Sequence, residues 1–185
     1  YSSDNYKRMS GNLGNSCMAK KEGLFGIYTE NPDVCKLLIL VEDDKLIGRA
    51  LVWKINIESE KFSAEWFMDR QYTIEDSDVI KFKNYADEKN WAYKTHNNHY
   101  SLRSVTYKGE VFPSIDMEVK LGNSDYKKFP YMDTFRRYDP VDHVLCNDDW
   151  DSSDYEGQYI LDHTDGSYRE VEGGNYSEYY DCNIP

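Results

Sequence analysis

Two apolar runs of strand length, residues 37–41 and 46–57, flank a short charged stretch at residues 42–45. Both runs are rich in β-branched and aromatic residues, which favour strands. A short polar stretch between two such runs is typical of a hairpin turn. The pattern therefore predicts a β-hairpin, and we expect this hairpin to be the folding centre of the chain.

The apolar positions change to helical spacing after residue 73. Val79, Phe82 and Ala86 recur on one face of residues 74–89, and charged residues fill the other face. Thr73 is followed three positions later by an acidic residue, an arrangement close to the capping box of a helix N-terminus. We therefore expect an amphipathic helix over residues 74–89, with Thr73 as its N-cap, that covers one face of a sheet.

Other segments alternate apolar and polar residues between turn signals, as strands do. A last hairpin is expected at residues 159–161, followed by a turn at residues 164–166, and we expect it to dock on the body of the protein. The predicted fold is α+β, with an antiparallel or mixed sheet of about five to seven strands and one main amphipathic helix. The further strands are expected at residues 24–29, 61–72, 91–94, 100–105, 111–121 and 127–137.

Charge divides the chain of 185 residues into two parts. Residues 1–140 contain 22 acidic and 21 basic side chains, whereas residues 141–185 contain 12 acidic side chains and a single basic one, Arg169. The second part is also poor in aliphatic residues, so it buries little apolar surface. We therefore expect a compact α+β domain at residues 1–140 and an acidic, Tyr-rich, loop-rich segment at residues 141–185.

The acidic segment is expected to bind a basic protein surface. Like charges repel it from nucleic acid and from anionic membranes, whereas closely spaced carboxylates can occupy a site that normally receives phosphates. Tyrosines between the carboxylates can stack on exposed arginines. The alternative is a solvated acidic run without a partner. The residues expected to carry the contact are Asp148, Asp149, Asp151, Asp154, Glu156, Tyr155 and Tyr159.

Two metal sites were considered in the acidic segment. The spacing from Asp149 onward begins like a calcium-binding EF-hand loop, but Asp154 stands where that loop needs Gly and Ile160 where it needs Glu, so the pattern fails. Zinc binds four nitrogen or sulfur ligands, and a metal would stabilise a segment with little core of its own. The alternative is that these side chains are scattered over a loop-rich segment. The four candidate zinc ligands are His143, Cys146, His163 and Cys182.

An anion site is the third candidate. The charged stretches Asp69-Arg70 and 133–137 can line one cleft with Arg49. The guanidinium groups of Arg49, Arg70 and Arg136 would then bind a small anionic ligand next to Tyr72 and Trp53. The alternative is a set of cross-strand salt bridges on the exposed face of the sheet.

Evidence for catalysis in the sequence is weak. Cys17 could act as a nucleophile if His96 or His99 activated it, but a lone cysteine is more often a small buried hydrophobic residue, and the two histidines fit a surface turn. The chain contains no P-loop, GxGxxG, GxSxG or HExxH motif. No cofactor other than zinc is expected, and four widely spaced cysteines favour a reducing compartment. No run reaches the roughly 18 apolar residues needed to span a membrane.

Five short motifs follow one another along the chain: SCM at 16–18, IYTENP at 27–32, GRALVW at 48–53, FMDRQYT at 67–73 and FPYMDTF at 129–135. Taken in this order, they resemble a group of proteins of unassigned function encoded by tailed bacteriophages. The resemblance covers residues 17–147 and implies a phage origin and a location in the cytoplasm of the infected bacterium or in the virion, but no activity.

We therefore expect a non-catalytic binding protein whose acidic segment engages a host protein and inhibits a nucleic-acid-binding or defence protein. The alternatives are a virion structural or assembly component, and a small enzyme or anion-binding protein with an Arg-lined cleft.

Overall fold

A computed structural model describes residues 13, 22–57, 62–97, 104–113, 115–122, 126, 129–147, 159–161 and 168–170. Its helical elements are η3 (Glu22–Leu24), α2 (Gly26–Thr29), η4 (Asp76–Asp78) and α3 (Val79–Glu88). The strands are β1 (Cys35–Glu42), β2 (Lys45–Lys54), β3 (Trp66–Thr73), β4 (Ala92–Lys94), β5 (Ser104–Tyr107), β6 (Glu110–Pro113), β7 (Glu118–Lys120), β8 (Arg137–Asp139), β9 (Val144–Cys146), β10 (Tyr159–Leu161) and β11 (Tyr168–Glu170).

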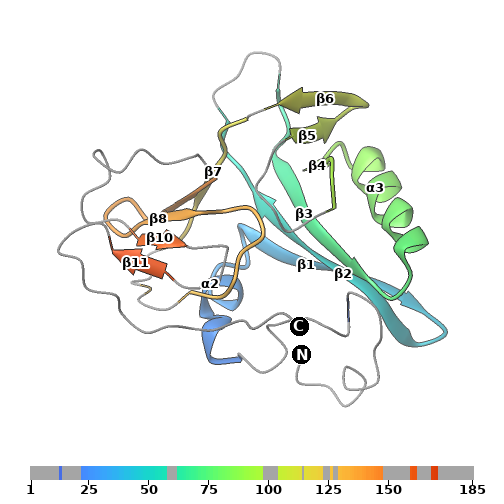
Figure 1. Cartoon of the computed structure of the whole chain (residues 1–185), viewed down its shortest axis with the longest axis horizontal. Helices are drawn as coiled ribbons and strands as arrows, with labels where there is room; N and C mark the ends of the chain where they lie inside the picture. The colour runs from blue at the N-terminus through green and yellow to red at the C-terminus, as the bar shows by residue number, and fades with distance from the viewer. Residues whose placement is uncertain are drawn as a thin grey trace.

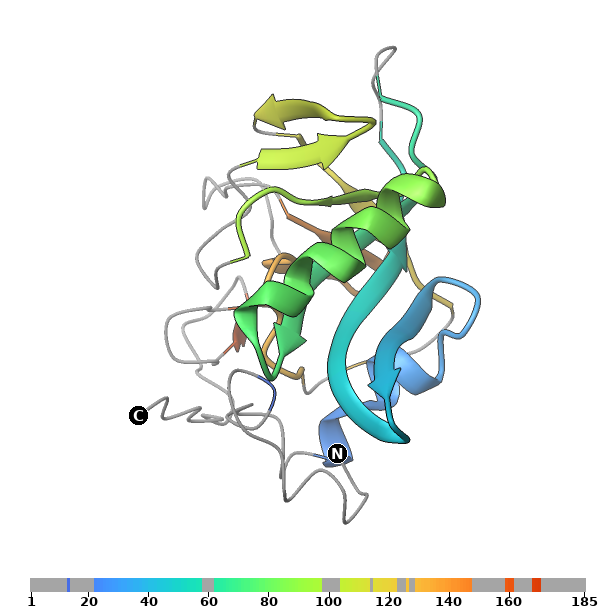
Figure 2. The same cartoon turned by 90° about the vertical axis from the view of Figure 1, so that its right-hand side faces the viewer.

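The fold is α+β, as predicted, but the described strands form two sheets instead of the one that we expected. The first sheet has six strands in the order β1-β2-β3-β4-β5-β6, and the second has five in the order β11-β10-β8-β9-β7. Only the pair of β3 and β4 is parallel among the described pairs, and α3 lies in the connection between them, as a parallel pair requires. Helix α3 covers one face of the first sheet, and the second sheet lies on the other side (Figures 1 and 2).

The predicted central hairpin is confirmed. Strands β1 and β2 pair in antiparallel register from Cys35 opposite Trp53 to Glu42 opposite Lys45. The two turn residues, Asp43 and Asp44, have φ angles of 47° and 60°. Two consecutive residues with positive φ form the kind of tight turn whose twist matches that of the flanking strands, and aspartate tolerates this conformation.

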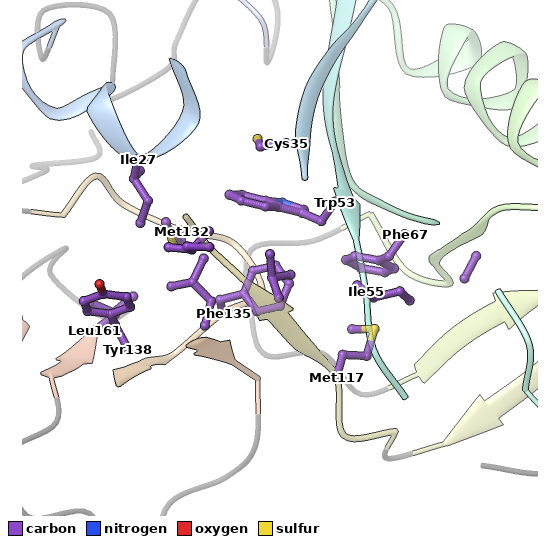
Figure 3. Packing of buried hydrophobic residues seen from close by; sticks show 14 of the residues in the cluster. Ile27, Cys35, Trp53, Ile55, Phe67, Met117, Met132, Phe135, Tyr138 and Leu161 are labelled. Carbon is purple, nitrogen blue, oxygen red and sulfur yellow. The ribbon is translucent and has the colours of Figure 1, made fainter. Parts of the chain in front are cut away.

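Two hydrophobic cores lie on the two faces of the first sheet. The smaller core packs Ala50, Val52 and Met68 of the sheet against Phe82 and Ala86 of α3. The larger core joins the first sheet to the second sheet. Figure 3 shows Trp53 extending from β2 over Met132 and Phe135, and the Trp53 and Phe135 rings meet edge to face at a centroid distance of 5.3 Å. Further members of the larger core are Ile27, Ile55, Phe67, Met117, Val119, Tyr138, Leu145 and Leu161.

The predicted strand at residues 24–29 is wrong, because these residues form η3 and α2. The Tyr28 N–H and the Glu30 N–H donate to the Phe25 and Gly26 carbonyls at 2.9 Å, as in a helical turn. Leu24 and Ile27 are both buried, at the i, i+3 spacing of one helical face. An apolar run this short does not distinguish a strand from a helix by its pattern alone.

The predicted helix begins later than residue 74. Thr73, the expected N-cap, is the last residue of β3 and pairs with Gly48 of β2. The Ile74 N–H then donates to the Ile47 carbonyl at 2.9 Å, so hydrogen bonding to β2 continues one residue past the expected N-cap. The helix ends at Glu88, close to the prediction, with the buried residues Phe82 and Ala86 on the predicted face.

Two of the later strand predictions need correction. The predicted strand at 111–121 is two strands, β6 and β7, which belong to different sheets. In the predicted strand at 127–137, only Arg137 is in a strand, and the described residues 129–136 form an irregular segment. Its aromatic residues Phe129, Tyr131 and Phe135 are buried, and burial of alternate aromatic side chains gave the segment its strand-like pattern.

The second sheet continues beyond Pro140, where we expected the compact domain to end. Strand β9 pairs with β8, and β10 and β11 form the predicted last hairpin, which pairs with β8. The predicted turn at residues 164–166 lies outside the described residues. No helix in the described part of the chain is long and apolar enough to span a membrane.

Candidate anion-binding site

A cavity of about 220 Å³ lies on the face of the first sheet that is opposite to α3. Its floor is formed by β1, β2 and β3, and its walls are formed by α2 and by the irregular segment before β8. The walls are mostly aromatic and aliphatic, with a few charged groups. The lining residues are Phe25, Tyr28, Thr29, Cys35, Lys36, Leu37, Arg49, Leu51, Trp53, Asp69, Arg70, Tyr72, Tyr131, Met132 and Asp133.

A β-bulge brings two charged residues of β3 to the cavity. Ala50 pairs with Gln71 and Val52 pairs with Met68, so Asp69 and Arg70 together lie opposite the single residue Leu51. Consecutive residues of a regular strand point to opposite faces of the sheet, whereas a bulge re-aims one of them. Both Asp69 and Arg70 therefore line the cavity.

The two guanidinium groups of the cavity lie next to Tyr72. Arg49 and Tyr72 are partners in the β2–β3 register, and the Arg49 Cζ is 4.3 Å from the centroid of the Tyr72 ring. The Arg70 Cζ is 4.7 Å from the same centroid. Asp133 joins this group, because its Oδ1 lies 3.3 Å from the Arg70 Nη1 and its Oδ2 accepts a hydrogen bond of 2.6 Å from the Tyr72 hydroxyl. Burial, together with the Asp133 charge, holds the pKa of Tyr72 well above its usual value, so the hydroxyl remains a donor at neutral pH.

A network of buried hydrogen bonds holds the elements around the cavity together. The Asp69 Oδ1 accepts hydrogen bonds from the Thr134 hydroxyl at 2.5 Å and from the Arg70 N–H at 2.8 Å. Burial raises the pKa of Asp69, while the nearby Lys94 ammonium opposes that rise. Lys94 is itself only 2% exposed, and its Nζ donates to the Asp133 carbonyl at 2.9 Å. These bonds tie β3 and β4 to the irregular segment and fix the position of Asp133.

Some buried donors of the lining residues have no acceptor among the residues that the structure describes. Within the described part of the chain, the Trp53 Nε1 and the Arg70 Nε are buried and make no hydrogen bond. Buried donors are usually satisfied by protein groups or by water, and leaving one unsatisfied costs about 1 to 3 kcal/mol. Lys36 also lines the cavity, but its Nζ lies over the Trp66 ring at 4.2 Å. Arg49, Arg70 and the buried Lys94 beside the cavity still outnumber Asp69 and Asp133, so the described charges favour an anion. The site therefore suits a small ligand that carries acceptor oxygens and a negative charge.

Cys35 provides the thiol of the cavity wall. It is a free cysteine, 5% exposed. Burial and the nearby Asp69 raise its pKa far above the usual value of a thiol. The attacking species of a catalytic cysteine is the thiolate, and burial next to the Asp69 carboxylate disfavours it. The cavity therefore favours binding of a ligand over nucleophilic chemistry at Cys35.

The structure brings together most of the predicted anion site but not all of it. Arg49 and Arg70 line the cavity with Tyr72 and Trp53, as expected. Arg136 is not among the lining residues, and its backbone N–H donates to the Cys146 carbonyl in the second sheet. The alternative was a set of salt bridges on the exposed face of the sheet. The Arg70–Asp133 ion pair forms instead in the cavity wall, where both side chains are largely buried.

The structure describes only part of the other candidate sites. His143 is half-buried with its Nδ1 3.2 Å from the Tyr138 hydroxyl, and Cys146 is buried in β9. No group of three or more His, Cys, Asp or Glu side chains that could hold a metal occurs among the described residues. Tyr159 packs against Phe129 with a centroid distance of 5.3 Å, at the larger core. Outside the described residues lie His163, Cys182, Cys17, His99, Asp148, Asp149, Asp151, Asp154, Tyr155 and Glu156, so zinc and partner contacts there stay predictions.

Several residues of the cavity were not predicted. Phe25 and Tyr28 reach it from the N-cap of α2 and from α2 itself, where the pattern predicted a strand, and Cys35, Met132 and Tyr131 gave no signal of their own. Lys94, which lies beside the cavity and does not line it, did give a signal: a lysine at the end of an apolar strand is unusual, because a lysine is almost never fully buried without a partner.

Comparison of the chain with known protein families, with curated proteins and with solved structures finds no match. The resemblance to tailed-phage proteins therefore stays a prediction.

Proposed function

We propose that the protein is a non-catalytic binding protein for an organic anion, and that the cavity between β1–β3 and α2 receives the anionic group. The observation that carries the proposal is that two guanidinium groups and the unsatisfied, buried indole N–H of Trp53 line one largely apolar cavity. Arg49 and Arg70 supply charge, and the Trp53 indole N–H supplies a further donor. Ligand sites are typically apolar cavities with a few polar groups that fix orientation.

The aromatic walls of the cavity indicate which group should be attached to the anionic group of the ligand. Tyr28 and Trp53 pack with a centroid distance of 5.7 Å, and the cavity is bordered by further aromatic rings from α2 and from the irregular segment. An apolar or aromatic group bound here would bury its surface against these rings, worth about 25 cal/mol for each Å² removed from water. A carboxylate attached to such a group matches both halves of the site.

Titration with benzoate and with acetate tests the proposal, with the fluorescence of the tryptophans or calorimetry as the readout. Benzoate is expected to bind more tightly than acetate, because only benzoate also contacts the apolar wall. Replacing Arg49→Gln should weaken benzoate binding at least tenfold, since a hydrogen bond to a charged group contributes about 1.5 to 3 kcal/mol.

Arg136→Gln is the matched control, because Arg136 is a half-buried arginine that does not line the cavity. Benzoate binding that is equally strong in the wild type and in Arg49→Gln would contradict the proposal. Thermal melts of all three proteins establish that a loss of binding is not a loss of folding.

A second candidate function rests on the acidic segment, and we infer it from charge alone. Residues 141–185 hold 12 acidic side chains and one basic one, which favours contact with a basic protein surface, such as that of a host nucleic-acid-binding protein in a phage-infected bacterium. Because β9 to β11 belong to the second sheet, truncation at Pro140 would remove three strands. The better test neutralises the five acidic residues from Asp148 to Glu156 in the full chain. Capture of a basic partner should then fall, and capture by the wild type should weaken with rising salt.

A further inference from the structure

The edge strand β1 exposes a strip of aliphatic side chains. Leu37, Ile39 and Val41 are 58%, 51% and 50% exposed. Alternate residues of a strand face the same side, so these three form one apolar strip. β1 is the terminal strand of its sheet, and no described strand pairs with its outer edge. Edge strands are commonly protected by charges, proline or shortness, so a long edge with an apolar strip indicates a binding surface.

This strip is continuous with the cavity. Leu37 belongs to both, and Ile39 is the register partner of Arg49. Among the lining residues, the exposed ones are Thr29, Lys36 and Leu37, which places the mouth of the cavity at the N-terminal end of β1. A ligand that leaves the cavity through this mouth therefore meets the strip and the open edge of β1.

The size of the cavity favours a ligand that extends beyond it. Cavities that enclose drug-sized ligands typically measure about 300 to 1,000 Å³. At about 220 Å³, this cavity accommodates one end group rather than a whole ligand of that size. The rest of a longer ligand would lie along β1.

We propose that the occupant is the C-terminal end of an extended polypeptide that pairs with the edge of β1 and places its terminal carboxylate near Arg49 and Arg70. The inference rests on the proposed function, since it names the source of the anion that the cavity binds. Such strand addition takes its affinity from main-chain hydrogen bonds and its specificity from pockets for alternate side chains. Here Leu37, Ile39 and Val41 would contact every second side chain of the peptide.

The charges of the cavity determine the direction of the peptide. An antiparallel peptide has its C-terminus at the N-terminal end of β1, where the cavity opens, and its N-terminus beside Val41. A parallel peptide would instead bring its terminal ammonium to the two guanidinium groups, which like charge disfavours. The partner is therefore a chain with alternating apolar residues and a free C-terminal carboxylate, bound antiparallel to β1.

The probe is an acetylated hexapeptide of alternating threonine and valine that ends in phenylalanine with a free carboxylate. It is expected to bind at least tenfold more tightly than benzoate and to lose at least tenfold in affinity when the carboxylate is converted to an amide. Analogues with one N-methylated peptide bond each should alternate between weak and strong binding, because only every second N–H of a strand faces its neighbour. Equal affinities throughout the N-methylated series would overturn the inference.

Two matched variants test the surface. Val41→Lys places a charge at the end of the strip far from the cavity mouth and should weaken hexapeptide binding at least tenfold while leaving benzoate binding unchanged. Val111→Lys is the control, because Val111 is a similarly exposed valine, 57%, on β6 at the opposite edge of the same sheet. Binding of the hexapeptide that is equal in both variants would exclude β1 as the docking edge.

The outcomes separate this inference from the proposed function. Benzoate binding that depends on Arg49, with hexapeptide binding no tighter than benzoate, overturns the inference and leaves the proposed function intact. If the wild type binds neither benzoate nor the hexapeptide, both the inference and the proposed function are wrong. If the wild type forms a dimer that Val41→Lys dissociates and the hexapeptide does not bind, the edge is occupied by a second copy of the chain and the inference is wrong.

Discussion

Replacing Asp133→Asn is expected to lower stability and to raise the affinity for an anion. The Asp133 carboxylate accepts from the Arg70 guanidinium at 3.3 Å and from the Tyr72 hydroxyl at 2.6 Å, and its side chain is only 11% exposed. Asn has nearly the same shape but lacks the charge. The substitution therefore weakens both contacts and removes a carboxylate that competes with the ligand for the guanidinium groups.

Both magnitudes follow from these contacts. A hydrogen bond to a charged group contributes about 1.5 to 3 kcal/mol and a neutral one about 0.5 to 1.5, so the two weakened contacts should lower the free energy of unfolding by about 1 to 3 kcal/mol. At about 2 to 4 °C for each kcal/mol, the Tm should fall by roughly 2 to 12 °C. A unit charge about 5 to 8 Å from a bound carboxylate contributes about 2 to 3 kcal/mol at an effective dielectric constant of about 20. Allowing for salt, we expect roughly a tenfold gain in affinity.

Urea denaturation, thermal melting and benzoate titration measure the two effects on one pair of proteins. Asp116→Asn is the control, because Asp116 is exposed and does not line the cavity. It should change neither quantity. An Asp133→Asn variant with wild-type stability and wild-type benzoate affinity would refute the reasoning. A variant that binds benzoate more weakly would show that Asp133 acts by positioning Arg70 rather than by competing with the ligand.

Three further predictions concern the scaffold of the site. Gly48→Ala should lower the free energy of unfolding by about 1 to 3 kcal/mol, because the new Cβ would lie 2.7 Å from the Phe82 ring, whereas Gly23→Ala, with nothing within 4 Å, should be neutral in the same urea titration. Burial raises the pKa of Asp69 in the folded state, so this carboxyl group favours folding most at acid pH and less as pH rises above about 4. The free energy of unfolding of Asp69→Asn, relative to that of the wild type, should therefore increase with pH. A difference between the two proteins that is constant from pH 4.5 to 7 would contradict this. Cys35 should resist iodoacetamide at pH 8 in the native protein and react in urea, as read by peptide mass spectrometry, since burial raises its pKa.

The parts of the fold that were predicted correctly are those in which local sequence and tertiary packing agree. The β1–β2 hairpin combines two long apolar runs with turn residues, Asp43 and Asp44, that tolerate positive φ. At Thr73 the two levels conflict. The capping sequence favours a helix start there, but the register with β2 extends the sheet to Thr73, and pairing along a whole strand outweighs a cap that contributes about 1 kcal/mol.

The candidate site was predictable to the extent that it depends on strand alternation. Arg49 and Tyr72 lie on one face because they are cross-strand partners of the predicted sheet. Asp69 joins Arg70 in the cavity only because of the bulge opposite Leu51, and no residue pattern indicates where a bulge occurs. Arg136 does not join the other two arginines, because residues 129–136 follow an irregular course and the Arg136 N–H donates to the Cys146 carbonyl in the second sheet.

The overall charge of the chain and the local charge of the cavity have opposite signs. The distance over which each of them acts in salt solution decides which one influences a ligand. The net charge is −12, with 12 of the acidic side chains after residue 140. At physiological ionic strength, charges separated by more than about 8 Å are largely screened from each other in solvent, whereas the buried Arg49 and Arg70 act at contact distance. An anionic ligand is therefore repelled by the whole molecule at low salt and attracted by the cavity once bound. It follows that moderate salt should accelerate association while leaving dissociation from the cavity nearly unchanged, the reverse of what a basic surface site would show.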